Sequence, residues 1–250
     1  ERASKLENIT LRGLQMHIGS QLTDVKPFIE AAEKVAPLAA KLKELYNIEF
    51  FSVGGGVGIV YSPALASGTA EWWQSHTEEA RPLTPEKYAA GVFPFLKDLG
   101  LKILVEPGRY IAGNAGVLLT ECLYEKKGAA KTFKIVDAGM NDLIRPALYE
   151  GHHEIVPLAE PTKETAHIPM DVVGPICETG DFFCQNRDLP DFAEGEYIAL
   201  LSAGAYGFVM ASNYNTRGLP AEILIDGASS KVIHPRQTVE DILAAEIASL

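Results

Sequence analysis

The chain has 250 residues, of which 47% are hydrophobic and 22% charged, so it can bury a sizeable core and is not expected to be disordered. Its 22 Lys and Arg residues against 33 Asp and Glu residues give a formal charge of −11 at pH 7, which argues against nucleic acid and anionic membranes as partners. No apolar stretch reaches the roughly 18 residues of a bilayer span, and the charged segment 1–8 does not resemble a signal peptide. We therefore expect a cytoplasmic protein with no nucleic acid or membrane partner.

The first 112 residues alternate between strand-like and helix-like patterns. Buried strands are expected over residues 12–18, 48–53 and 101–105. A helix is expected from Thr23 or Asp24, either of which can cap it, to about Asn47, and a second from Thr84 to Leu99. This alternation with short links is typical of a parallel α/β sheet or barrel.

The segment between the second strand and the second helix, residues 61–85, has no clear periodicity. It contains prolines, a glycine and two adjacent tryptophans. We expect a loop or lid there, and its role is left open.

Beyond about Gly113 the pattern changes to short strand-like runs separated by turns. The runs are residues 116–124, 132–137, 168–173, 197–201 and 222–225. We therefore expect two domains, the α/β part over residues 1–112 and a mostly β domain over residues 113–250, closed by a helix from Thr238 to Leu250.

Neither the cysteines nor the histidines suggest a metal site. Cys122, Cys177 and Cys184 form neither a Cys-x-x-Cys pair nor an even set, which argues against a disulfide framework and against structural zinc. The histidines show no metal-ligand spacing shared with carboxylates, so no metal is predicted.

Two polar segments follow the first two predicted strands. The glycines of Gly54-Gly55-Gly56 allow backbone N–H groups to approach an anion, although a tight turn without a ligand is an alternative. The imidazole of His17 can stack on a flat heteroaromatic ring and the hydroxyl of Ser20 can donate to a phosphate. A structural histidine is the alternative.

The third predicted strand leads into Glu106-Pro107-Gly108-Arg109. A carboxylate there can keep a pyridine nitrogen protonated, and an arginine can bind phosphate or carboxylate through two parallel hydrogen bonds. The alternative is an internal ion pair between Glu106 and Arg109.

Three further segments of the second half carry reactive side chains. Cys177 follows a strand and its thiol can protonate a carbanion, although buried cysteines are often inert. Tyr206, flanked by Gly204 and Gly207, could offer its hydroxyl to a phosphate, or it could belong to an ordinary turn. Arg145 and Tyr149 lie one helical turn apart, for which a surface salt bridge is the alternative.

In this order, these segments resemble the motifs of the fold-type III pyridoxal-phosphate decarboxylases. The matching segments are His17–Gln21, Gly54–Gly56, Glu106–Arg109, Cys177–Asp181 and Ala205–Gly207. The resemblance runs over essentially the whole chain. It implies a pyridoxal 5'-phosphate-binding, TIM-like (β/α)8 barrel followed by a C-terminal β-sandwich or β-barrel domain, as in alanine racemase-like proteins.

The resemblance also implies roles for individual residues. The expected cofactor-binding residues are His17, Ser20, Gly54, Gly55, Gly56, Glu106, Gly108, Arg109 and Tyr206. His17 would stack on the pyridoxal ring, and Glu106 would pair with its nitrogen. The expected catalytic residues are His17 and Cys177, the latter as the acid that returns a proton after carbon dioxide leaves. Cys177 would act with Glu178 across the interface of a homodimer, on the partner's cofactor.

Within this family, the sequence is most similar to members that convert meso-2,6-diaminopimelate into L-lysine, the last step of lysine biosynthesis. The expected substrate-binding residues are Arg109, Arg145, Tyr149, Glu178 and Tyr206. Two guanidinium groups suit the distal carboxylate of this amino-acid substrate, and one carboxylate suits its distal ammonium. Alternatives are another decarboxylase of the family, such as one acting on carboxynorspermidine, or a non-catalytic homologue that dimerises.

One expected feature of the family is missing. Its members carry a lysine on an early barrel strand, in a segment like Val-Lys-Ala-Asn, that bonds covalently to the cofactor, and none of the lysines from Lys5 to Lys231 lies in such a segment. Only about three of eight barrel strands are predicted. We therefore expect the C-terminal part of a longer polypeptide, whose N-terminal portion was removed or forms another chain, or else a decayed homologue.

Overall fold

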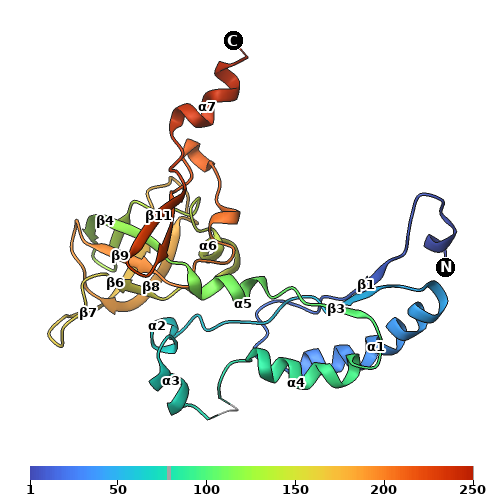
Figure 1. Cartoon of the computed structure of the whole chain (residues 1–250). Coiled ribbons are helices and arrows are strands. Elements are labelled where there is room, and N and C mark those ends of the chain that lie inside the picture. Colours follow the sequence, from blue (N-terminus) through green and yellow to red (C-terminus); the bar gives the residue numbers. More distant parts are fainter. Residues whose placement is uncertain (78–79, 250) are drawn as a thin grey trace. The chain divides into compact units, whose positions relative to one another are not determined.

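The computed structural model describes residues 1–77 and 80–249, and the chain divides into two compact units (Figure 1). The first unit comprises Glu1–Val60 and Ser67–Ala112, and the second comprises Tyr61–Ala66 and Gly113–Leu250. The short segment Tyr61–Ala66 thus lies within the first 112 residues of the chain but packs with the second unit.

The first unit is built on a three-stranded parallel sheet in the order β1-β2-β3. Its elements are η1 (Ala3–Lys5), β1 (Gly13–Gln15), α1 (Lys26–Tyr46), β2 (Phe50–Ser52), α3 (Ala70–Ser75), α4 (Pro85–Leu96), β3 (Lys102–Leu104), α5 (Gly108–Ala112) and, continuing from α5 into the second unit, η2 (Gly113–Ala115). Helices α1 and α4 pack against each other beside the sheet (Figure 1), and Phe28 and Phe51 are buried in the shared core. The predicted alternation of parallel strands and helices is confirmed.

Local sequence explains where the two long helices begin and end. Helix α1 buries residues spaced three or four apart and ends at Tyr46. Its C-cap is Asn47, whose left-handed backbone (φ 53°) asparagine tolerates better than most residues. The predicted cap was wrong by one or two positions, because Val25 is the N-cap, although Asp24 accepts a hydrogen bond from the Lys26 amide (3.0 Å). Helix α4 starts as predicted, with Thr84 accepting from the Lys87 amide (3.3 Å), and ends at Leu96, earlier than predicted.

The expected loop at residues 61–85 was partly wrong. It contains two short helices, α2 (Ala64–Ser67) and α3, and the second is capped by the Thr69 side chain, which accepts from the Trp72 amide (3.3 Å). Helices this short span too few turns for a periodic pattern to appear in the sequence. Residues 78–79 of this stretch lie outside the described residues.

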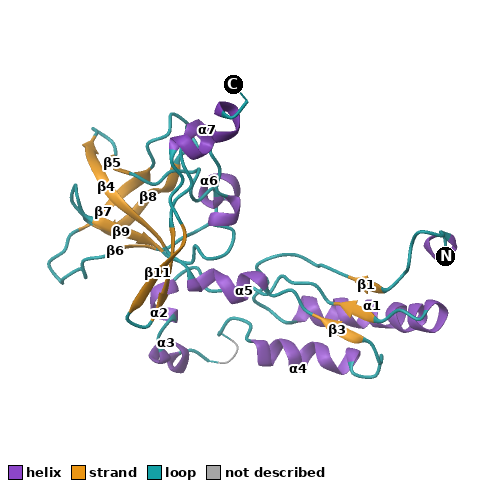
Figure 2. Cartoon of the chain, turned by 45° about the horizontal axis from the view of Figure 1, so that its top comes forward, coloured by secondary structure: helices purple, strands orange, loops and turns teal. Residues whose placement is uncertain are grey.

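The second unit is built on a six-stranded mixed sheet in the order β6-β9-β4-β5-β7-β8, with a separate β10-β11 hairpin (Figure 2). Its elements are α2, which continues to Ser67, β4 (Leu118–Lys127), β5 (Thr132–Val136), α6 (Arg145–Tyr149), β6 (Ile155–Pro157), β7 (His167–Val173), β8 (Phe182–Pro190), β9 (Tyr197–Leu200), η3 (Phe208–Met210), η4 (Tyr214–Thr216), β10 (Glu222–Asp226), β11 (Ser229–His234) and α7 (Val239–Ile247). The sheet curls so that its edge strands β6 and β8 contact each other, which gives a nearly closed, barrel-like body. The fold class expected from the family resemblance is therefore confirmed.

The five predicted runs of the second half all form strands, but three strands were missed. Strand β6 has only three residues, while β8 mixes polar and apolar residues and pairs with β7 through irregular register, so neither shows a clean alternation. Strand β11 completes a hairpin of which only β10 was predicted. The final helix begins at Val239 after a capping box between Thr238 and Asp241. Its predicted end at Leu250 lies outside the described residues.

Over the part of the chain that the structure describes, no helix combines the length and the apolar character needed to cross a membrane.

Candidate functional site

The predicted cofactor residues of the first unit follow three neighbouring parallel strands. His17 comes two residues after β1, Gly54 two residues after β2 and Glu106 two residues after β3. Because the strands are adjacent and parallel, their carboxyl ends share one edge of the sheet, where open α/β sheets bind ligands. The structure therefore brings these predicted residues together.

Glu106 is held as a carboxylate by residues that the sequence analysis missed. Its Oε1 accepts hydrogen bonds from Ser52 Oγ (2.6 Å) and Gln15 Nε2 (3.0 Å). These bonds, with a smaller contribution from His17, lower the pKa of the exposed Glu106 below its ordinary value, against a smaller opposing effect of desolvation. Gln15 and Ser52 are the last residues of β1 and β2 and pair in register. A polar residue closing an otherwise apolar strand was the signal that could have found them.

The glycine loop has no room for side chains. Gly54 has φ +77°, and a Cβ there would lie 2.2 Å from the carbonyl oxygen of Met16. Gly56 has φ +100°, and a Cβ there would lie 2.3 Å from the carbonyl oxygen of Gly19. Both positions therefore require glycine, because the backbone is left-handed and the loop after β1 lies directly against it.

The loops after β1 and β3 meet through a hydrogen bond from Arg109 Nη2 to Ser20 Oγ (3.0 Å). Arg109 lies on α5, and Gly108 begins this helix with no atom within 4 Å of where its Cβ would stand. The Gly55 amide also points to His17 Nδ1 at 3.4 Å, a long contact. Three segments far apart in sequence thus form one edge.

This donor set fits pyridoxal 5'-phosphate. Backbone amides of a glycine loop, a serine hydroxyl and an arginine are groups that bind phosphate. An ionised Glu106 suits a protonated ring nitrogen. The first unit therefore offers both an anion-binding and a cation-pairing group at one sheet edge.

In the second unit, Cys177 and Glu178 lie on a turn held by a buried carboxylate. Asp181 Oδ1 accepts from the Met140 amide and Oδ2 from the Ile176 amide, both at 2.6 Å. Burial raises the pKa of Asp181, while these amide bonds oppose that rise. Asp181 therefore fixes the turn that carries Cys177, and it connects this turn to the loop after β5.

The side chains that this turn presents are exposed. The Cys177 thiol is a free, exposed cysteine, unlike the buried Cys122 and Cys184. Glu178 accepts hydrogen bonds from the Gly180 amide (3.4 Å) and from Tyr214 Oη (3.3 Å), which lower its pKa. Tyr214 was missed, because an isolated tyrosine in a polar segment carries no motif.

The predicted substrate residues Arg145 and Tyr149 lie on the same short helix, α6, in different surroundings. Arg145 is only 8% exposed, so the alternative of a surface salt bridge is wrong, whereas Tyr149 is 61% exposed. A Cβ on Gly180 would lie 3.8 Å from Ala147 Cβ, so the Cys177 turn borders this helix.

Tyr206 lies on a tight turn with φ +59° and is 40% exposed. The next residue, Gly207, could not carry a side chain without lying 2.2 Å from the Ala203 carbonyl oxygen, and its Cβ would be 3.6 Å from Leu143 Cδ1. The Tyr206 and Cys177 turns therefore both border the segment around α6. Within the second unit, the structure gathers the predicted residues around this helix.

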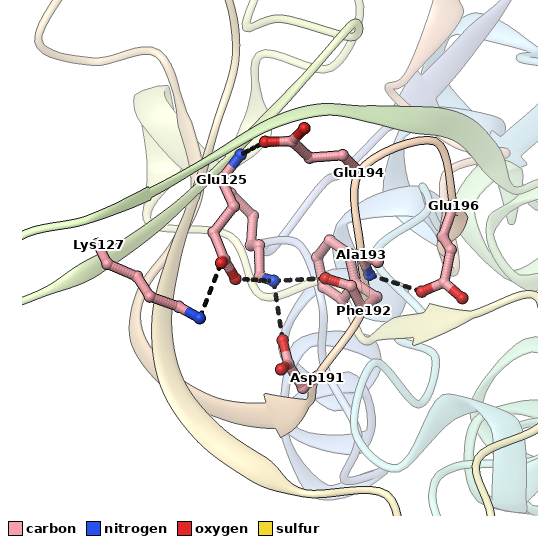
Figure 3. Close-up of a pocket in the computed structure, with 8 residues that line it drawn as sticks. Glu125, Lys127, Asp191, Phe192, Ala193, Glu194 and Glu196 are labelled. Carbon is pink, nitrogen blue, oxygen red and sulfur yellow. Dashed lines mark hydrogen bonds and ion pairs between the residues drawn. The ribbon is translucent and has the colours of Figure 1, made fainter.

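A separate hollow of about 460 Å³ lies by β4, β5 and the loop after β8, and it is lined mostly by charged residues (Figure 3). The ammonium of Lys134, 1% exposed, bonds Glu125 Oε2 (2.5 Å), Asp191 Oδ1 (2.8 Å) and the Phe192 carbonyl. Glu194 accepts from the Glu125 amide (2.9 Å). These carboxylates already hold internal partners, so we assign the hollow a structural role.

Among the described residues, no group of three or more His, Cys, Asp or Glu side chains is arranged to hold a metal ion.

Comparison with known proteins identifies the family. A family model described as the pyridoxal-dependent decarboxylase C-terminal sheet domain matches residues 33–204. The chain therefore belongs to the pyridoxal-dependent decarboxylase family.

Several diaminopimelate decarboxylases are similar to this chain. The chain is 44% identical over 244 residues to the diaminopimelate decarboxylase of Aquifex aeolicus, covering 97% of this chain and 54% of the relative. It is 43% identical to that of Haemophilus influenzae, covering 98% and 55%. The crystal structure of Helicobacter pylori diaminopimelate decarboxylase complexed with L-lysine matches with a TM-score of 0.83 at 39% identity, covering 100% of this chain and 58% of that one. The chain thus spans little more than half the length of these relatives.

Proposed function

We propose that this chain is the C-terminal part of a pyridoxal-phosphate enzyme that converts meso-2,6-diaminopimelate into L-lysine and carbon dioxide. The observation that carries the proposal is the edge of the first unit, where an ionised Glu106 lies on the same side of three parallel strands as a glycine loop and the Ser20–Arg109 pair. The identity of 43–44% to diaminopimelate decarboxylases supports the choice of reaction.

In this proposal the first unit holds the cofactor. The amides of Gly54–Gly56, Ser20 and the segment Gly108–Arg109 would bind its phosphate, with Tyr206 of the second unit adding a contact. His17 would stack on its ring and Glu106 would keep its nitrogen protonated. When bound, pyridoxal phosphate withdraws the electrons left by carboxylate loss.

The second unit would supply the proton and recognise the substrate. Cys177 would donate its thiol proton to the substrate carbon that has lost carbon dioxide, with Glu178 beside it. Arg145, with Arg109, would bind the distal carboxylate, Glu178 would bind the distal ammonium, and Tyr149 and Tyr206 would border the substrate.

The complete site would need further polypeptide. The lysine that bonds covalently to the cofactor would come from a segment outside these 250 residues, and Cys177 and Glu178 would serve the cofactor of a second subunit in a homodimer. Intact mass measurement of the protein purified from its source tests this. We expect a mass well above 27.1 kDa, or a second co-purifying chain. A lone 27.1 kDa chain would contradict it and favour a non-catalytic homologue.

A substrate panel tests the reaction. The complete, cofactor-loaded enzyme should release carbon dioxide from meso-diaminopimelate, and much more slowly from carboxynorspermidine or ornithine. Arg145→Met should raise KM for diaminopimelate steeply, whereas Arg12→Met, which removes an exposed pair with Glu49, should not. Preference for carboxynorspermidine would replace this proposal with the alternative decarboxylase.

A further inference from the structure

Arg145 is enclosed by two side chains to which no role has yet been assigned. Its Nη1 lies 2.7 Å from His153 Nε2, and its Cζ lies 4.6 Å from the centre of the Tyr61 ring. The Tyr61 and His153 rings meet edge to face, with centroids 5.6 Å apart and planes at 83°. All three residues belong to the second unit.

The hydrogen bonds of His153 fix its tautomer. Its Nδ1 lies 2.8 Å from the Leu201 carbonyl oxygen, which can only accept, so Nδ1 carries the hydrogen. The lone pair of Nε2 then accepts from the Arg145 guanidinium. His153 is fully buried and its pKa falls to about 4, chiefly because burial disfavours the charged ring. A neutral imidazole is therefore the acceptor that this arginine meets.

The backbone around His153 is also anchored. Arg187 of β8 donates from Nη1 to the His153 carbonyl oxygen at 2.6 Å. The imidazole thus has little freedom to turn, because its ring is bonded at one nitrogen and its own carbonyl is bonded to a neighbouring strand. A fixed acceptor fixes the direction of the guanidinium that bonds to it.

Tyr61 reaches Arg145 because its segment is tied to the second unit. The Leu65 amide donates to Glu154 Oε2 at 2.8 Å, next to His153 in the chain. Residues 61–66 therefore act as a strap on the second unit, and the Tyr61 ring covers one face of the guanidinium through a cation–π contact. This gives a role to the start of the segment whose function the sequence left open.

We infer that Tyr61 and His153 are positioning residues that hold the Arg145 guanidinium in one orientation, ready to bind a carboxylate at the far end of the substrate. The inference rests on the proposed function. An arginine side chain loses considerable rotamer freedom when it binds, so fixing it in advance strengthens carboxylate binding. The hydrogen bond sets the direction of the planar fork, and the ring limits its rotation.

The test compares two ligands that differ at the distal carboxylate. L-lysine keeps the amino-acid head that Arg145 would bind, and cadaverine lacks its carboxylate. Their binding to the complete, cofactor-loaded protein is measured by isothermal titration calorimetry. His153→Asn keeps a donor for the Leu201 carbonyl but removes the acceptor for Arg145, and we expect it to weaken lysine binding about tenfold and cadaverine binding less than twofold.

His153→Gln is the matched control, because its side-chain oxygen can take the place of Nε2 and accept from Arg145. We expect lysine binding within about threefold of wild type for this variant. Tyr61→Leu, a change at a half-buried position, tests the ring independently if His153→Asn fails to fold. It should also weaken lysine selectively.

Two results would overturn the inference: equal weakening of lysine and cadaverine in the folded variants, or lysine binding that none of them changes. The proposed function fails in a different way. If the wild-type protein binds lysine no better than cadaverine, there is no distal carboxylate site for Arg145 to form, and this result does not depend on any variant.

Discussion

The first unit presents its candidate residues on loops that follow three parallel strands, whereas the second unit presents them on turns held by buried polar side chains. In the first, the backbone itself forms the surface, and Gly54 and Gly56 leave no space for a Cβ. In the second, the carboxylate of Asp181 holds the Cys177 turn, and the imidazole of His153 holds Arg145.

The difference follows from what each unit would bind. A phosphate is suited by backbone amides that glycines leave accessible. A substrate with a carboxylate, an ammonium and a carbon that must accept a proton needs individual side chains in fixed orientations. Buried hydrogen bonds provide these orientations. Substitutions in the two units should therefore fail differently, the first by losing cofactor and stability, the second by losing rate or selectivity.

The largest effect is expected from Cys177→Ala in the complete enzyme. If Cys177 is the proton donor that we propose, this change should lower kcat by about 10³-fold, with cofactor absorbance unchanged because the thiol lies in the second unit. Exposed Thr179→Ala, on the same turn, is the control and should retain most activity. Parallel loss of activity and cofactor would contradict the division of roles between the units.

In the first unit, Gly54→Ala should lower the free energy of unfolding by more than about 3 kcal/mol, because it adds a clash to a strained left-handed backbone. Gly108→Ala in the same unit has no neighbour within 4 Å and no left-handed backbone, so it should change stability by less than about 1 kcal/mol. Denaturant unfolding of the complete protein measures both. Equal losses of unfolding free energy in the two variants would contradict the tight packing of the glycine loop in this structure.

The lowered pKa of His153 predicts that the stability of the second unit depends on pH. Its pKa is about 4 when folded and 6.5 when unfolded, so between these values the unfolded chain binds a proton that the folded chain does not. Stability is therefore complete above pH 6.5 and is lost as pH falls to 4, by about 3 kcal/mol.

Denaturant unfolding at several pH values measures this dependence. His153→Gln should reduce the pH slope of stability between 4 and 6.5, the range set by the two pKa values of His153. Thr179→Ala, at an exposed residue that does not ionise, is the control and should leave the slope as it is in wild type. A slope that survives in His153→Gln would mean that other groups, such as carboxylates, produce it.

The smallest effect is expected from Tyr214→Phe, which removes the hydrogen bond to Glu178. Because both side chains are exposed, KM for diaminopimelate should rise only about threefold, with kcat unchanged. Tyr197→Phe removes a comparable bond to Glu121 (2.8 Å) on the β4–β9 pair and serves as the control. A change in kcat instead would indicate that Tyr214 affects the Cys177 turn rather than Glu178.

Several features of the site could be found from sequence because each has a local signature. A glycine run after a strand, a Glu-Pro-Gly-Arg segment and a cysteine in a polar turn are visible in the sequence as candidates, each with a structural alternative. The strands of the first unit were found for the same reason, since buried runs bounded by glycine are visible in sequence. Whether the two sets of residues serve one site stays a prediction.

The residues that hold the site in place were not found from sequence. Ser52 and Gln15 donate hydrogen bonds to Glu106 from 54 and 91 positions away in the sequence. The Tyr61 ring contacts Arg145 from a segment that was expected to be a loop. Such contacts depend on how distant segments fold against one another, so a local pattern can mark a polar side chain but not the partner that it meets.

By itself, the sequence determined the order of the reactive groups and the alternation of strands and helices, because these depend on neighbours along the chain. The tertiary structure alone decided which side chains are buried and what they bond. It made Arg145 a buried cation beside a neutral imidazole rather than a surface charge, since burial and hydrogen-bond geometry arise only when separate segments meet.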